Sequence, residues 1–278
     1  MKRVFARSFC LCLSVFLFGV IALLTVDVSA QQVAIIEKIP DAVDYYNRGC
    51  ACGEADLDCR IENFSRAVEL DPALTEAYNN RGLAYFARND AQRALADFNR
   101  TVELSPNFAK GFYNRAVLYA RLGEHEKSIG DFTRAAELSP SLTNAYVGRG
   151  SVYLKLKNFD AALRDFDRAA ALEPLYAEIY YNRGLAYFYK TDYERAATDF
   201  TNVLRLKPQF TAAYLNRGIC YDKLEKAAQA IADYTRFIEL APEDYRGYSN
   251  RAGVYTKIGE TAKAEADTRR VSQLKRST

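Results

Sequence analysis

The sequence predicts an all-α protein, a solenoid built from about seven stacked helical hairpins. Two residue types recur with a constant step of 34 residues. Prolines do so at Pro72, Pro106, Pro140, Pro174, Pro208 and Pro242, and arginines at Arg81, Arg115, Arg149, Arg183, Arg217 and Arg251. Apolar and small residues inside each unit have helical spacing, as Tyr78, Gly82 and Tyr85 show. A fixed period of this length is the signature of structural repeats that stack on one another.

Each unit contains two short helices. Ala94, Phe98 and Thr101 lie on one face of the second helix, which Pro106 brings to an end. The link between the two helices, residues 88–90, is so short that they must run antiparallel. Such a hairpin cannot bury both of its apolar faces alone, so it has to pack against its neighbours.

When the proline is counted as position 32, three further positions share a residue type. Position 4 is aromatic: Tyr45, Tyr78, Phe112, Tyr146, Tyr180, Tyr214 and Tyr248. Position 8 is small: Gly49, Gly82, Ala116, Gly150, Gly184, Gly218 and Ala252. Position 24 is aromatic in all but the last unit: Phe64, Phe98, Phe132, Phe166, Phe200 and Tyr234, then Thr268. Over about residues 42–278 this pattern resembles the tetratricopeptide repeat family.

The resemblance implies an α-solenoid that coils as a right-handed superhelix. Its repeats fall at about 42–74, 75–108, 109–142, 143–176, 177–210, 211–244 and 245–278. The polar second helix of the last repeat is typical of a cap, because nothing stacks beyond it.

The N-terminal segment has the layout of an export signal. Three basic residues near the start precede an uncharged apolar run over residues 9–26, and small residues follow at 28–30. Residues 1–30 therefore predict a secretory signal peptide, and residues 31–41 a short leader. We expect the protein in the periplasm or outside the cell. The alternative is an uncleaved N-terminal helix that anchors the chain, since eighteen apolar residues can just cross a bilayer.

The charge balance argues against nucleic acid as a partner. From residue 31 onwards 35 basic side chains face 34 acidic ones, whereas proteins that bind phosphate carry a basic excess. The single histidine, His125, lies in a turn between two glutamates. The sequence contains no nucleophile–base pair, phosphate-binding glycine loop or histidine metal spacing. We therefore expect no catalytic, cofactor-binding or metal-binding residue.

Arginine occupies position 7 of every unit, where the family usually has a leucine-like residue. Position 23 is aspartate in six units and Asn63 in the first. Because these two positions lie equally far from the turn, we expect Arg–Asp pairs inside the hairpins, such as Arg81–Asp97. The alternative is that the arginines bind an acidic ligand; their matched aspartates favour the pairing.

In this family the first helix of each hairpin lines a concave face, so the resemblance implies a groove for a partner polypeptide. Position 6 on that helix is asparagine in six units: Asn47, Asn80, Asn114, Asn182, Asn216 and Asn250. An amide both donates and accepts, so it can pair with the backbone of an extended peptide. Aromatic residues stand at neighbouring positions: Tyr46, Phe86, Tyr113, Tyr181, Phe188 and Tyr189. The alternative is that the asparagines bond only to neighbouring helices.

Other positions narrow the expected role. The family's clamp for a C-terminal carboxylate needs lysine at position 5 and asparagine at position 9, and this chain has neither. Lys155, Lys223, Arg246 and Lys257 suggest tolerance for an acidic stretch, although a solvated rim explains them equally well. We expect a scaffold that binds a protein or peptide and assists assembly or transport in the cell envelope. The alternative is a structural or self-associating spacer subunit.

Three cysteines crowd into the first repeat. Cys50 and Cys52 are two apart on a helix and so point in opposite directions, while Cys59 lies across the turn. An oxidising compartment favours a Cys52–Cys59 disulfide, with Cys50–Cys59 as the alternative. Zinc is the poorer option, because three thiols lack a fourth ligand. Cys220 takes a small buried position, where we expect an inert thiol.

Overall fold

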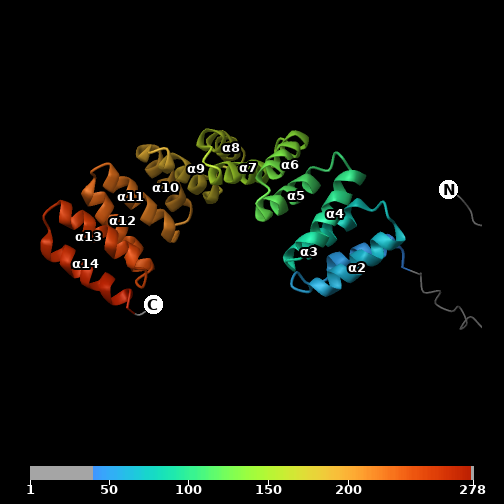
Figure 1. Ribbon diagram of the computed structural model, residues 1–278, viewed down its shortest axis with the longest axis horizontal. Coiled ribbons are helices and arrows are strands. Elements are labelled where there is room, and N and C mark those ends of the chain that lie inside the picture. The colour runs from blue at the N-terminus through green and yellow to red at the C-terminus, as the bar shows by residue number, and fades with distance from the viewer. Residues whose placement is uncertain (1–39, 277–278) are drawn as a thin grey trace, which may run out of the picture. The chain divides into compact units, whose positions relative to one another are not determined.

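The computed structural model describes residues 40–276, and every regular element in that range is an α-helix (Figure 1). The fourteen helices form seven antiparallel pairs: α1 (Ala42–Ala51) with α2 (Leu57–Leu70), α3 (Thr75–Ala87) with α4 (Ala91–Leu104), α5 (Ala109–Leu122) with α6 (His125–Leu138), α7 (Thr143–Lys155) with α8 (Phe159–Leu172), α9 (Ala177–Tyr189) with α10 (Tyr193–Leu206), α11 (Thr211–Lys223) with α12 (Ala227–Leu240), and α13 (Tyr245–Lys257) with α14 (Thr261–Leu274). This confirms the predicted all-α repeat fold.

The predicted signal peptide, residues 1–30, lies outside the described residues, as do residues 31–39 of the leader. Within the part of the chain that is described, no helix is both long and apolar enough to cross a membrane.

Local chemistry fixes where the helices begin and end. Four second helices start at a side chain that accepts a backbone hydrogen bond from three residues on: Asp56, Asp90, Asn158 and Asp192. Prolines stand two residues beyond the ends of second helices, as Pro106 does after Leu104. From the second pair onwards, one residue in the turn between the two helices of each pair adopts a left-handed backbone, which Gly123 and Gly259 do without strain. Four other turns use residues with a Cβ: Asn89, Lys157, Thr191 and Glu225.

Each of the first six pairs closes around one aromatic ring. These rings, at position 24 of the second helix, are at most 2% exposed. The first helix usually faces the ring with glycine: a Cβ on Gly82 would lie 2.7 Å from Cε1 of Phe98, closer than such atoms approach. The missing side chain therefore lets the helices close onto the ring.

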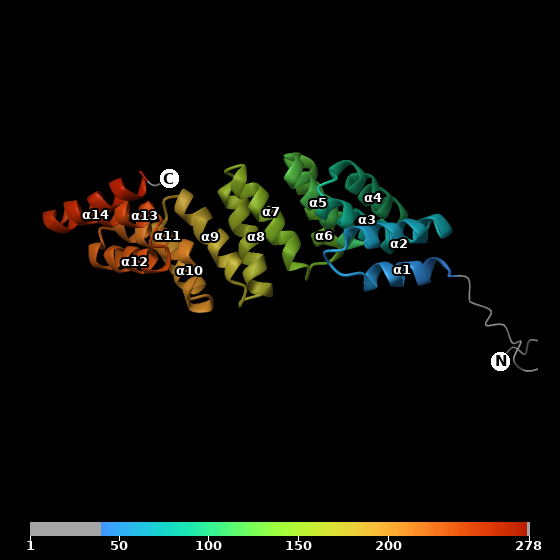
Figure 2. The same ribbon diagram turned by 90° about the horizontal axis from the view of Figure 1, so that it is seen from below.

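Successive pairs stack in chain order, because every helix packs against the next one (Figure 2). First helices of neighbouring pairs also touch, as α7 and α9 do. Buried residues from adjacent pairs join in shared clusters: Ala116 and Phe132 of the third pair pack with Val152 of the fourth. The core thus runs on from one pair to the next.

From Arg81 onwards, each arginine at position 7 joins three helices. The Nε and Nη2 groups donate to both carboxylate oxygens of the aspartate in the same pair, at 2.6–2.9 Å. This confirms the predicted pairs from Arg81–Asp97 to Arg251–Asp267. The Nη1 group donates in addition to a short polar side chain on the preceding second helix, as Arg149 does to Thr133 at 2.8 Å. The carboxylates are almost fully buried, and the hydrogen bonds that Arg183 donates to Asp199 raise the pKa of Arg183.

The two end pairs depart from this pattern. In the last pair Ala252 and Thr268 replace glycine and ring, and α14 buries only three side chains. Its remaining surface is exposed and polar, as expected for a cap. In the first pair Asn63 replaces the aspartate and donates to the carbonyl of Cys59 at 2.9 Å, while Arg48 stays exposed.

We predict that Asp165→Ala lowers the free energy of unfolding by about 3 kcal/mol, because it leaves the Arg149 guanidinium buried without its carboxylate. Urea denaturation followed by circular dichroism measures this. The control is Glu69→Ala, which breaks the exposed Arg66–Glu69 pair and should cost less than about 1 kcal/mol. Equal losses of unfolding free energy in the two variants would show that the arginine junction stabilises the fold no more than an exposed ion pair does.

Candidate functional site

The asparagines at position 6 fall into two groups. Three of their amides donate to the side chain at position 5 of the preceding first helix: Asn80 to Tyr46 Oη at 3.3 Å, Asn114 to Asn79 Oδ1 at 2.8 Å, and Asn216 to Tyr181 Oη at 3.1 Å. These three amides therefore tie one pair to the next. Much of their hydrogen-bonding capacity is used inside the protein.

Asn182 and Asn250 have no such partner. The residues at position 5 of the helices before them are Val147 and Leu215, which offer no polar atom. Neither amide makes a side-chain hydrogen bond to any residue between 40 and 276, and both are partly exposed. These two amides are available to a ligand. Asn47 on α1 is exposed and has no preceding helix pair in the described part.

Gly148 interrupts the asparagine series for a steric reason. A Cβ on Gly148 would lie 2.6 Å from Cε1 of Phe132 in the preceding pair. In that pair position 8 is Ala116, whose methyl group occupies the space that glycine leaves free elsewhere. The Phe132 ring packs against Ala116 of its own pair and, in addition, lies close against α7 of the next pair at Gly148. Every pair with glycine at position 8 is followed by asparagine at position 6, and the third pair, with alanine, is followed by glycine.

We predict that Gly148→Ala lowers the free energy of unfolding by about 1–3 kcal/mol through overpacking against Phe132. The matched control is Gly253→Ala on α13, where a Cβ meets nothing within 4 Å and the better helix propensity should add about 1 kcal/mol. In an Ala116→Gly background the cost of Gly148→Ala should shrink, because the Phe132 ring could then move closer to α5 and away from α7. Urea midpoints test all three. A stabilising Gly148→Ala would contradict this account.

The predicted aromatic residues differ in how much of each ring is exposed to a ligand. Tyr46, Tyr113 and Tyr181 pack against core rings, with centroids 5.8 Å from Phe64, Phe132 and Phe200 respectively. Burial raises the pKa of Tyr113 and of Tyr181, so these two rings are partly core residues. Phe86 lies under the Arg121 guanidinium, 5.0 Å from ring centroid to Cζ. Tyr189 is different: it is 58% exposed.

Tyr189 borders the largest of the described cavities, a pocket of about 680 Å³ between α7 and α9. The pocket is lined by Ser151, Leu154, Lys155, Lys157, Phe159, Leu185 and Tyr189. The ring of Phe159, at the start of α8, stacks on Tyr189 with centroids 5.8 Å apart and planes at 13°. The sequence reasoning included Tyr189 but missed Phe159 and Lys157. The sequence did mark Lys157 as unusual, because two other turns have glycine at the same position.

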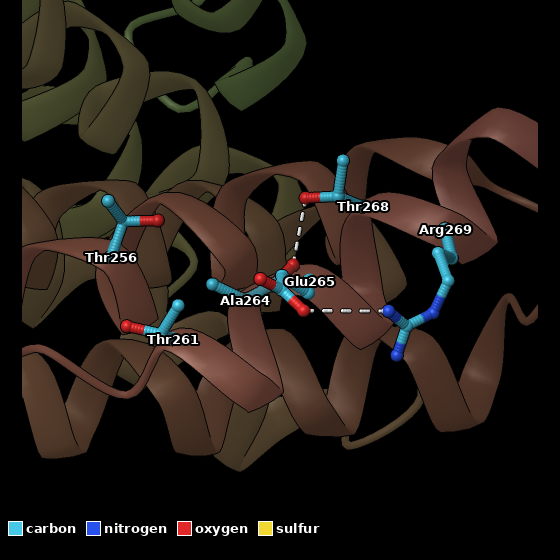
Figure 3. A pocket seen from close by; sticks show the side chains of 6 residues that line it. All are labelled: Thr256, Thr261, Ala264, Glu265, Thr268 and Arg269. Carbon is cyan, nitrogen blue, oxygen red and sulfur yellow. Dashed lines mark hydrogen bonds and ion pairs between the residues drawn. The ribbon is translucent and has the colours of Figure 1, made fainter.

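A smaller cavity, of about 350 Å³, opens on the last pair beside Thr256, Ala264 and Thr268 (Figure 3). One lining residue, Thr268, stands at position 24, where the first six pairs hold a buried ring. The Thr268 hydroxyl donates to the carbonyl of Ala264, and Arg269 pairs with Glu265 at its rim. Its lining is mostly small and polar, as expected for the end of the array.

The three cysteines of the first pair lie close to one another. Cys52 and Cys59 are joined through their sulfur atoms, with Cα atoms 6.0 Å apart, and Cys50 is a free, exposed thiol. Cys220 is fully buried, and burial raises the pKa of its thiol to about 12. No group of three or more His, Cys, Asp or Glu residues suited to a metal ion occurs within residues 40–276.

Alkylation tests the cysteine assignment. In the oxidised native protein we expect iodoacetamide to label Cys50 and to spare Cys220, whose protonated thiol is inaccessible. Peptide mapping without reduction should find Cys52 linked to Cys59. Labelling of Cys52 in place of Cys50 would show that the alternative Cys50–Cys59 bond forms.

Comparison with known proteins agrees with this architecture. A family profile described as Tetratricopeptide repeat matches residues 61–109, 79–142 and 181–245, more than half of the chain, and a TPR repeat profile matches residues 150–191. No curated protein matches the sequence.

Several solved structures share the fold. One is YrrB, a TPR protein with an unusual peptide-binding site (22% identity, TM-score 0.60, 67% of this chain and 96% of that one). Another is a tetratricopeptide repeat protein from Parabacteroides merdae (21%, 0.62, 84% and 93%). A third is the C-terminal part of a TPR repeat-containing protein from Cytophaga hutchinsonii (20%, 0.69, 85% and 95%). At these identities the likeness concerns the fold alone.

Proposed function

Because the chain belongs to the tetratricopeptide repeat family, we propose that it is a non-catalytic scaffold that binds an extended segment of a partner polypeptide along its first helices. Proteins of this family are generally non-catalytic scaffolds that bind peptide or protein partners. The predicted signal peptide supports a role outside the cytoplasm, in assembly or transport within the cell envelope.

The free amides of Asn182 and Asn250 are the observation that carries this proposal. Each lies on a first helix, is partly exposed and has no hydrogen-bond partner among the described side chains. On α9, Asn182 stands three and seven residues before Leu185 and Tyr189, on the same helical face as the largest pocket. An amide beside an apolar pocket can bind the backbone of an extended peptide while the pocket takes one of its side chains.

Self-association is the weaker proposal. A head-to-tail contact would have to cover the outer face of α14, which is polar and exposed. Such a face is typical of a terminal cap that keeps the array soluble. We therefore do not propose a spacer that polymerises through its ends.

We predict that Asn182→Ala and Asn250→Ala each weaken peptide binding by about threefold to tenfold, the effect of one lost hydrogen bond, without lowering stability. Dodecapeptides selected from a random display library on the full chain serve as probes, and their Kd values are measured by fluorescence anisotropy. Asn107→Ala, in the exposed loop after α4, is the control.

Asn216→Ala distinguishes the two groups of asparagines. It breaks the hydrogen bond to Tyr181 and should lower the free energy of unfolding by about 1 kcal/mol. The proposed function would be refuted if the correctly folded chain selected no peptide. It would also be refuted if the Asn182→Ala and Asn250→Ala variants bound the selected peptides as tightly as the wild type.

A further inference from the structure

The pocket between α7 and α9 carries uncompensated positive charge beside an apolar floor. Lys155 and Lys157 both line it, and its lining contains no acidic residue. Neither ammonium group has an ion pair or side-chain hydrogen bond with any residue from 40 to 276. Lysines just after α9 and α10 are paired instead: Lys190 with Asp160, and Lys207 with Glu178. The two positive charges at the pocket are therefore left for a ligand.

The corresponding pocket two repeats later shows that this charge is not a general property of the repeat. Between α11 and α13 a cavity of about 450 Å³ is lined by two acidic and two basic residues. Glu225 stands there in place of Lys157, and Ala227 in place of Phe159. Lys257 is bound to Asp222 at 2.7 Å, so the charge is compensated. Only the first of these two pockets combines stacked rings with unpaired lysines.

The backbone conformation is the same in both pockets, since Glu225 has φ +59° at the equivalent position, so the contrast lies in the side chains. Lys157 has φ +60°, a left-handed conformation that Gly123 and Gly259 adopt at the equivalent turn position. Unlike glycine, lysine at this position supplies a charged side chain, and that side chain lines the pocket.

From these observations we propose that the α7–α9 pocket recognises an extended peptide segment in which a large apolar side chain is flanked by acidic residues. This rests on the proposed function and names the chemistry of the partner. The apolar side chain enters between Leu154, Leu185 and the Phe159–Tyr189 stack. The flanking carboxylates pair with the ammonium groups of Lys155 and Lys157.

The test is selection from a random heptapeptide display library on the immobilised full chain, with C-terminally amidated peptides synthesised from the selected sequences. The variant Lys155→Gln/Lys157→Gln removes both charges and keeps the side-chain length. Lys223→Gln, at the position equivalent to Lys155, is the matched control. Circular dichroism verifies that each variant folds. We expect the wild type and the control to enrich peptides with an aromatic or large aliphatic residue between acids, and the double variant to lose this enrichment.

A defined probe gives the magnitude. For fluorescein-labelled Gly-Ser-Asp-Phe-Asp-Ser-Gly-amide we expect the double variant to bind about threefold to tenfold more weakly, since exposed ion pairs contribute little each. Peptides with asparagine for both acids, or alanine for the phenylalanine, should lose affinity as well. Enrichment of peptides without this pattern, or an unchanged selection by the double variant, would overturn the inference and leave the proposed function standing. A folded wild type that enriches no peptide would overturn both.

Discussion

The close approach of two helices around one buried ring is the constraint on which the rest of the structure depends. The ring at position 24 leaves no room for a Cβ on the opposing helix, so glycine at position 8 sets how near the two backbones come. In the third pair, where position 8 is Ala116, the Phe132 ring leaves no room for a Cβ at Gly148 of the next pair. A core substitution in one repeat thereby changes the residue that the following repeat can present on its surface.

The arginine junction, formed by each position-7 arginine with its own and the preceding second helix, links successive pairs. A guanidinium group has donors pointing in fixed directions, so one arginine holds its own second helix with two hydrogen bonds and the previous one with a third. Lysine has no such fork and cannot make the same three contacts. The junction fixes the offset between neighbouring pairs, and through it the spacing of the surface asparagines and pockets.

The fold could be predicted from the sequence because the same aromatic, small and charged positions recur in every 34-residue unit. The Arg–Asp pairs could be predicted as well, since positions 7 and 23 are placed symmetrically about the turn. The third contact of each arginine was missed, because the register inside one repeat says nothing about the offset between two repeats. Short polar residues at position 25, such as Thr133 and Asp167, were the available signal.

The candidate site was harder to predict for a similar reason. All six asparagines look alike within a single repeat, and whether an amide is free depends on position 5 of the repeat before it. Asn216 donates to the hydroxyl of Tyr181, whereas Val147 offers Asn182 no polar atom. The pocket also depends on residues from three helices, and Phe159 and Lys157 belong to a turn that repeat comparison treats as variable.

The first pair lacks the ionic junction that holds the others, because Asn63 stands where they have aspartate, and its helices are joined through Cys52 and Cys59 instead. Within the described residues the first pair has a neighbour on one side only, so it is where a linear array frays first. We expect reduction of a Cys52–Cys59 bond to favour local unfolding of α1 and α2. The ion-paired repeats contain no cysteine pair, so the same chemical change should leave them intact.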